Sequence, residues 1–149
     1  MAAISIPNVG ESFLGERPQV VKVQKVSVGF TGEDVNFDAQ ETLAVFNVPA
    51  NCLVLDVYAY TDEAWTTSVT LDVGDGTDPN GWLATAKVAP TSAQTDGLVK
   101  RTSKATAEAF AGGKLYAAAD TIDVVIAGAT PAVGKTDIYI EYIENVNAL

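Results

Sequence analysis

The residues with the clearest chemical potential stand close together in a segment rich in aspartate and glycine. Asp72, Asp75, Asp78 and Asn80 provide carboxylate and amide oxygens, the hard ligands that calcium prefers. Their spacing is not that of an EF-hand, because the second acidic position and the closing glutamate are absent. Two interpretations follow: a calcium site that stabilises a hairpin, or ordinary turn chemistry, in which Asp, Asn and Gly satisfy a tight reversal of the backbone. We favour turn chemistry, and no other cofactor is indicated.

Residues that could support catalysis do not form a persuasive set. The chain has no histidine, so a serine or cysteine nucleophile lacks its usual base and zinc lacks its preferred nitrogen ligands. Two acidic pairs, Asp72 with Asp75 and Asp62 with Glu63, could be nominated for glycoside hydrolysis, but turn chemistry and solubility explain both. The glycine-rich string at 73–81 precedes a predicted strand rather than a helix, so it is not a phosphate-binding loop. We therefore predict that the protein is not an enzyme.

Charge and cysteine content restrict the expected partners and compartment. A formal net charge of −10 repels phosphate backbones and anionic lipids, so neither nucleic acid nor a membrane is an expected partner. The first residues have no basic segment ahead of an apolar core and are not expected to form a signal peptide. Cys52 is the only cysteine and stands in an apolar context, which predicts a buried, inert thiol in a protein made in a reducing cytoplasm.

The acidic segment lies between two predicted strands. In residues 66–73 apolar and polar residues alternate, the pattern of a half-buried antiparallel strand. Gly74, Gly76 and Gly81 are expected to supply the positive φ angles of the reversal. Residues 81–88 are then expected to form the returning strand of a long hairpin.

Further strands are predicted over residues 21–30, 42–48, 53–60, 114–118, 121–127 and 136–143. A phase change at Gln24 and Lys25 predicts a β-bulge in the first of them. Residues 53–60 are apolar on both faces, which predicts a strand covered on both sides. One of these faces is expected to hold Leu53, Leu55, Val57 and Ala59, and the other Val54, Tyr58 and Tyr60. In the last strand the inward stripe is expected to be Ile138, Ile140 and Tyr142.

About eight strands separated by turn signals, with little helix, predict one all-β domain. We expect a single-domain antiparallel two-sheet sandwich over residues 19–149, with a jelly-roll-like topology preferred and an immunoglobulin-like sandwich as the main alternative. Hydrophobic residues make up 48% and charged residues 19% of the chain, which is typical of a folded domain rather than a disordered one.

Two segments outside the regular strands are candidates for contacts with other molecules. Residues 1–18 have prolines, glycines and no sustained period, as in an extended N-terminal arm. The apolar residues of this arm are Ile4, Ile6, Phe13 and Leu14. They are too apolar for a freely solvated tail, so we expect the arm to lie on its own domain or on a neighbouring subunit, with a disordered terminus as the alternative. Residues 89–113 form the second candidate, a long irregular loop with room for a short helix at 104–110.

The aromatic residues lead to different expectations. Trp65 follows a polar segment and is expected to be exposed, as at a contact surface. Trp82 begins a predicted strand and is expected to cap the edge of the core. The strand tyrosines, Tyr58, Tyr60, Tyr139 and Tyr142, are expected on sheet faces, although a row of them could form a platform that stacks on sugars.

Residues 45–86 carry a resemblance to a known family. The run VFNVPANCLVLDVYAYTDEAWTTSVTLDVGDGTDPNGWLATA resembles a pattern found in small virion proteins of tailed bacteriophages. In that pattern VPA leads into a hydrophobic strand, and DVGDGTDPDGW or a near variant joins the next two. Here Asn80 stands where aspartate is common, which weakens the calcium interpretation. The resemblance implies a virion structural protein, and most directly a capsid decoration (cement) protein with a jelly-roll-like fold.

The resemblance also implies an address and a set of partners. A decoration protein would sit on the outer surface of the phage head as a symmetric oligomer, here a homotrimer, and would bind the major capsid protein and stabilise the shell. It would be made in the cytoplasm of the bacterial host, and the arm and Trp65 would be natural contacts. Two alternatives stay open: a tail, baseplate or head-fibre structural protein, and a carbohydrate-binding β-sandwich module in which Trp65 and Trp82 stack on sugar.

Overall fold

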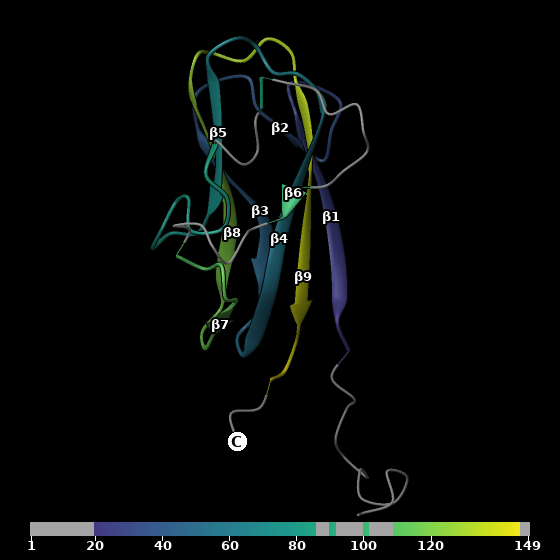
Figure 1. The fold of residues 1–149 in the computed structure, drawn as a ribbon, viewed down its shortest axis with the longest axis vertical. Helices are drawn as coiled ribbons and strands as arrows, with labels where there is room; N and C mark the ends of the chain where they lie inside the picture. Colours follow the sequence, from purple (N-terminus) through teal and green to yellow (C-terminus); the bar gives the residue numbers. More distant parts are fainter. Residues whose placement is uncertain (1–19, 86–89, 92–99, 102–108, 147–149) are drawn as a thin grey trace, which may run out of the picture.

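The computed structural model describes residues 20–85, 90–91, 100–101 and 109–146, which form two β-sheets packed face to face (Figure 1). The strands are β1 (Lys22–Gly29), β2 (Val35–Asn36), β3 (Thr42–Val48), β4 (Cys52–Glu63), β5 (Val69–Gly74), β6 (Lys100–Arg101), β7 (Lys114–Tyr116), β8 (Asp120–Gly128) and β9 (Lys135–Ile143). The larger sheet has the order β2-β1-β9-β4-β6, with β7 also paired to β4, and the smaller sheet has the order β3-β8-β5. The predicted all-β sandwich is confirmed.

The strands pair in a nested order that defines the topology. β1 pairs with β9, β3 with β8, and β4 with β7, each time antiparallel. β5 continues this nesting through an antiparallel bridge between Val73 and Leu83. Because the first strand pairs with the last and each later pair lies inside the one before, the chain behaves as one long hairpin rolled into two sheets. This is the arrangement of a jelly roll, as predicted.

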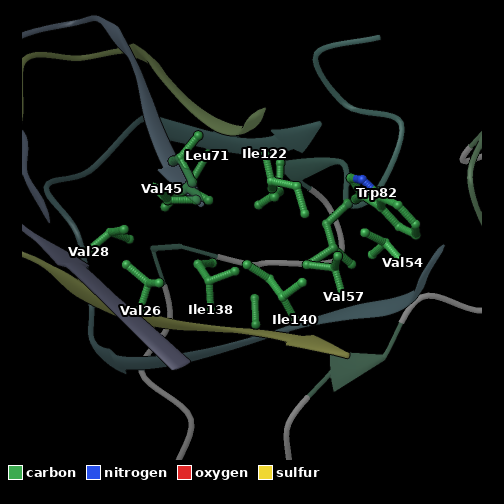
Figure 2. Packing of buried hydrophobic residues seen from close by; sticks show 14 of the residues in the cluster. Val26, Val28, Val45, Val54, Val57, Leu71, Trp82, Ile122, Ile138 and Ile140 are labelled. Atoms are coloured by element: carbon green, nitrogen blue, oxygen red, sulfur yellow. The ribbon is translucent and has the colours of Figure 1, made fainter. Parts of the chain in front are cut away.

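The core lies between the two sheets (Figure 2). Val28, Ile138 and Ile140 of the larger sheet and Leu71 and Ile122 of the smaller sheet have no exposed area. Side chains alternate along a strand, so each sheet turns one apolar face toward the other. Each fully buried side chain of this size stabilises the fold by about 1.5–3 kcal/mol. The inward stripe predicted for the last strand is confirmed, since its third member, Tyr142, is also buried.

The predicted faces of β4 are wrong. A β-bulge between Val54 and Asp56 inserts one extra residue relative to β9. Cys52 and Val54 point inward before the bulge, whereas Val57 and Ala59 point inward after it. Because one extra residue exchanges the two faces of a strand, a single alternating pattern could not hold along its whole length.

The bulge predicted in β1 is not present. β1 pairs with β9 in continuous register from Lys22 opposite Tyr142 to Gly29 opposite Lys135. The first four residues of β1 are exposed on both faces and the last four are buried. A strand needs alternating apolar and polar residues only where one face is buried and the other is exposed. Because β1 changes from fully exposed to fully buried at its middle, the apolar pattern changes phase there without a bulge.

The predicted strand at 81–88 is reduced to the bridge at Leu83 in the residues that the structure describes. The backbone N–H of Thr85 donates to Oδ1 of Asp72 at 2.6 Å instead of to a neighbouring strand. The Asp72 side chain, which belongs to β5, therefore replaces the next backbone hydrogen bond after the bridge at Leu83. The arm at 1–18, and most of the helix expected at 104–110, lie outside the described residues. The described ranges contain no helix with the length and apolar character of a membrane span.

Candidate functional site

Asp75 organises the acidic loop between β5 and Leu83. Its side chain is 1% exposed, and its Oδ1 accepts hydrogen bonds from the backbone N–H groups of Thr77 and Asp78, at 2.9 and 3.1 Å. Its Oδ2 accepts a hydrogen bond from the Tyr116 hydroxyl at 2.8 Å and forms an ion pair with the Lys114 ammonium. The carboxylate therefore connects the loop to β7, a strand that follows much later in the sequence.

Electrostatics in this cluster keep Asp75 ionised. Burial by itself would raise its pKa, but the hydrogen bonds from Lys114, Tyr116 and the loop backbone outweigh burial and leave the pKa below its usual value. Burial raises the pKa of the Tyr116 phenol, and the neighbouring Asp75 carboxylate raises it further, although the hydrogen bond with Trp82 acts in the opposite direction. At neutral pH the cluster consists of an anion, a cation and a neutral phenol. Their hydrogen-bonding needs are met by one another, which is the arrangement that a buried charge requires.

The four residues predicted as calcium ligands take part in hydrogen bonds of the loop. Oδ1 of Asp72 accepts hydrogen bonds from the backbone and the hydroxyl of Thr85, at 2.6 and 2.8 Å. Asp78 receives the Asp75 N–H on its carbonyl at 3.0 Å and the Asn80 N–H on its carboxylate at 3.4 Å. Among the residues that the structure describes, no three acidic, histidine or cysteine side chains are grouped to hold a metal ion. The hydrogen bonds that Asp75 and Asp78 accept from loop N–H groups are those that turn chemistry predicts, and the Lys114 ammonium lies beside the buried Asp75 carboxylate.

Two glycines of this loop, Gly74 and Gly81, are needed for space, and none of its three glycines has the positive φ that was predicted. The described glycines with positive φ are Gly32, Gly113, Gly128 and Gly134. At Gly74 a Cβ would lie 2.0 Å from the carbonyl oxygen of Asp78, and at Gly81 it would lie 2.3 Å from the ring of Phe110. Close approach of backbone and ring, which only glycine allows, fixes these two positions.

Trp65 is buried, so the prediction of an exposed tryptophan is wrong. It is 3% exposed and packs edge-on against Phe37 at a centroid distance of 6.4 Å. Its indole N–H donates to Oγ1 of Thr136 at 2.9 Å, and Gly134 leaves room for its ring. Trp65 therefore closes one end of the core and offers no contact surface.

Trp82 and Cys52 are also buried, with no exposed area. The Trp82 indole N–H donates to the Tyr116 hydroxyl at 3.2 Å, so this tryptophan is a core residue that also joins the Asp75 cluster. Burial raises the pKa of the Cys52 thiol, which disfavours the reactive thiolate. The predicted buried thiol is confirmed.

Exposed apolar side chains are concentrated at the start of β1. Val20, Val21 and Val23 are 59%, 51% and 58% exposed, whereas the other large apolar residues exposed in the described ranges are the separate Leu115 and Val133. The predicted contact residues Ile4, Ile6, Phe13 and Leu14 lie outside the described residues. Val21 and Val23 were missed as a contact surface because their alternation was interpreted as part of a strand, and Val20 lies just before that predicted strand.

Comparison with known proteins identifies solved structures that share this fold. No family model and no curated protein matches the sequence. A chain of the capsid asymmetric unit of cyanophage Pam1 matches with a TM-score of 0.59 at 22% identity, covering 94% of this chain and 99% of that one. This chain has the fold of a phage capsid chain.

Two further capsid structures support the same fold. A chain of the capsid of Ralstonia phage GP4 matches with a TM-score of 0.57 at 19% identity, covering 86% of both chains. A chain of the acid-stable capsid of the Helicobacter pylori bacteriophage KHP30 matches with a TM-score of 0.53 at 13% identity, covering 84% of this chain and 90% of that one. Identities this low establish shared architecture, and function has to be argued from the surface that the architecture presents.

Proposed function

We propose that the protein is a capsid decoration (cement) protein that binds the outer surface of a tailed-phage head and stabilises the shell. The observation that carries the proposal is the match to the Pam1 capsid chain, which extends over almost the whole of both chains. A match of this extent means that the two chains are of nearly equal length. The likeness therefore involves a small capsid chain as a whole, rather than one domain of a larger subunit.

Surface charge and the inert interior support this role. A net charge of −10 keeps an outward-facing protein soluble and away from packaged nucleic acid. In the Asp75 cluster the buried carboxylate pairs with the half-buried Lys114 ammonium and accepts hydrogen bonds from Tyr116 and the loop backbone, so the cluster stabilises the fold. Partners on the shell would be the major capsid protein and further copies of this chain, arranged as a homotrimer.

A glycan-binding module is the less favoured alternative. It requires exposed aromatic rings that stack on sugar, yet Trp65 and Trp82 are both buried. Tyr58 and Tyr142 are buried as well, and Tyr60 and Tyr139 are half-buried. A tail, baseplate or head-fibre address is less favoured because the three structures compared above are capsids.

Binding to heads that lack the protein tests the proposal. Purified protein is mixed with expanded heads of the phage that encodes it, assembled without it, and the heads are collected by sedimentation. We expect saturable binding at a fixed number of copies per head and a higher temperature of head disruption. Heads that already carry the protein are the control and should take up none.

Binding to isolated tails, with none to undecorated heads, would contradict the proposal and favour a tail or baseplate address. Binding that free sugars displace would instead favour the glycan-binding alternative.

A further inference from the structure

The margin of the larger sheet formed by β1 is largely open. β2 covers this margin only at the end of β1, where Val28 pairs with Val35 and Gly29 with Asn36. Figure 1 shows β1 at the side of the sheet, with β9 as its long neighbour among the described strands. The edge from Lys22 to Val26 has no paired strand among the described residues.

Hydrogen bonds near β2 identify which backbone groups face the open side. The Ser27 N–H donates outward to Oδ2 of Asp34 at 2.8 Å, and the Gly29 carbonyl accepts from the Phe37 N–H at 2.8 Å. Since backbone groups alternate direction along a strand, those of Val23 and Lys25 face the same side. The Lys25 carbonyl accepts from the side-chain amide of Gln24 at 3.1 Å. The Val23 N–H and carbonyl and the Lys25 N–H have no partner within the part of the chain that the structure describes.

The lysines of β1 do not protect this edge. Lysine on an edge strand commonly prevents the addition of another strand. Here the Lys25 ammonium is held by Asp137 of β9 at 2.7 Å, and the Lys22 ammonium is held by Glu144 at 2.5 Å. Both charges are drawn back over the protein's own sheet, away from the edge.

Apolar side chains line the same open stretch. Val21 and Val23 lie on the outer face of the sheet, opposite in direction to the buried Val26 and Val28, and each is more than half exposed. Val20 is exposed just before them. Open backbone groups beside exposed valines are the two features by which an extended apolar segment is recognised when it adds to a sheet.

We propose that this edge binds the N-terminal segment of a second copy of the protein as an added β-strand. The segment before Val20 has 19 residues, and an extended chain of that length reaches roughly 60 Å, enough to cross to a neighbouring subunit. Ile4 and Ile6 flank Ser5, so in an added strand both isoleucines would share one face, beside Val21 and Val23. Every copy has one such segment and one such edge, so the exchange can close a symmetric ring.

The proposal deepens the proposed function by naming a contact between copies, but it is tested without any phage head. Two variants are prepared separately, one with Val23→Cys and a cleavable tag, the other untagged with Ile4→Cys or Ile6→Cys. They are mixed and oxidised with diamide, which takes up the two thiol hydrogens as the disulfide forms. We expect a disulfide-linked species containing one tagged and one untagged chain from at least one pair. Wild-type protein, whose Cys52 is fully buried, should give none.

A chain that contains both Val23→Cys and Ile6→Cys shows whether the N-terminal segment binds the β1 edge of another copy or that of its own chain. Linkage within single chains only, with no link between chains, would overturn the proposal, because the segment would then lie on its own edge. Absence of any link in all pairs would overturn it as well.

Val23→Pro gives an independent readout. At this position the N–H faces the open side, so proline removes no hydrogen bond to β9 but blocks an added strand. We expect Val23→Pro to reduce the oligomer to monomers while Val23→Thr, the matched control, retains it. Val23→Asp serves if the proline variant does not fold. An unchanged oligomer in a folded Val23→Pro or Val23→Asp variant would overturn the inference, whether or not the protein binds heads.

Discussion

At the scale of single residues, Asp75 shows how an acidic sequence motif can serve the fold. A buried carboxylate is costly unless it is paired and hydrogen-bonded, and this one is paired with Lys114 and bonded to the Tyr116 hydroxyl and two backbone N–H groups. The neighbouring aspartates also accept backbone N–H bonds, Asp78 from Asn80 in its own turn and Asp72 from Thr85 beyond the loop. These contacts within the protein stabilise the loop.

Replacement of Asp75 by asparagine should destabilise the protein strongly. Asparagine can still accept the two backbone N–H bonds, but it leaves the Lys114 ammonium without its anion, which costs roughly 3 kcal/mol for a buried pair. Urea unfolding measures the change, and Asp62→Asn, at an exposed position, should shift the free energy of unfolding by less than about 0.5 kcal/mol. In the double variant with Lys114→Met the loss should be smaller than the sum of the two single losses; additive losses would contradict the pairing.

Calcium gives a direct test of the alternative role of the acidic loop. We expect the Asp75→Ala variant to lose the same amount of thermal stability in calcium buffer and in chelator, because the carboxylate bonds to Lys114 and to the loop. A loss that appears only in calcium would show that Asp72, Asp75, Asp78 and Asn80 hold a metal ion.

Acid should selectively weaken the contribution of Asp75. Its pKa in the folded protein is lowered, while an unfolded aspartate has a pKa of about 3.9. Between those two values the unfolded chain binds more protons than the folded one, so stability falls as pH falls. The contribution is complete above the unfolded value and is lost as pH drops through the folded value. The gap in urea midpoint between wild type and Asp75→Asn should narrow on acidification from pH 6; a constant gap would contradict this assignment.

At the scale of elements, the acidic loop depends on two close approaches of its backbone. Gly74→Ala would push a Cβ to within 2.0 Å of the Asp78 carbonyl oxygen, whereas Gly76→Ala meets nothing within 4 Å. We expect Gly74→Ala to lower the free energy of unfolding by roughly 2 kcal/mol or more through overpacking. Gly76→Ala should leave stability unchanged or raise it by up to about 1 kcal/mol by restricting the unfolded chain. Equal effects of the two substitutions would show that the loop tolerates a shift.

Strand patterns in the sequence predicted the sandwich, and most strand positions, because burial of one face imposes alternation. Val69, Leu71 and Val73 are all buried as expected. The pattern failed where tertiary contacts decide the outcome: the bulge in β4 depends on its pairing with β9, and Trp65 is buried by Phe37 and Gly134, which are distant in sequence. The polar residues next to Trp65 in the sequence do not indicate these distant partners. The Asp75 cluster could not be predicted from the sequence either, because Lys114 lies 39 residues from Asp75 in the chain.

At the scale of the whole molecule, the arm should be separable from the domain. Deletion of residues 1–17 removes none of the described core, so we expect the truncated protein to retain its thermal unfolding midpoint within a few degrees. We also expect it to bind heads more weakly and to lose its oligomeric state. Unchanged head binding would remove the arm from the attachment mechanism.

Light scattering on a sizing column, in calcium and in chelator, measures the mass of the oligomer with and without the arm. The full chain should be a trimer in both buffers and the truncated chain a monomer. A monomeric full chain in both buffers would move support toward the glycan-binding alternative.

The nested pairing of strands also fixes when the protein can fold during its own synthesis. β9 lies between β1 and β4 in the larger sheet (Figure 1), yet about 100 residues separate it from β1 in the chain. At typical rates of chain elongation the ribosome needs roughly 5–20 s to make that stretch, and throughout this time the short β2 is the one described strand already made that pairs with β1. Nascent chains therefore stay aggregation-prone until β9 has been made, and a premature stop before β9 would leave the larger sheet without its central strand.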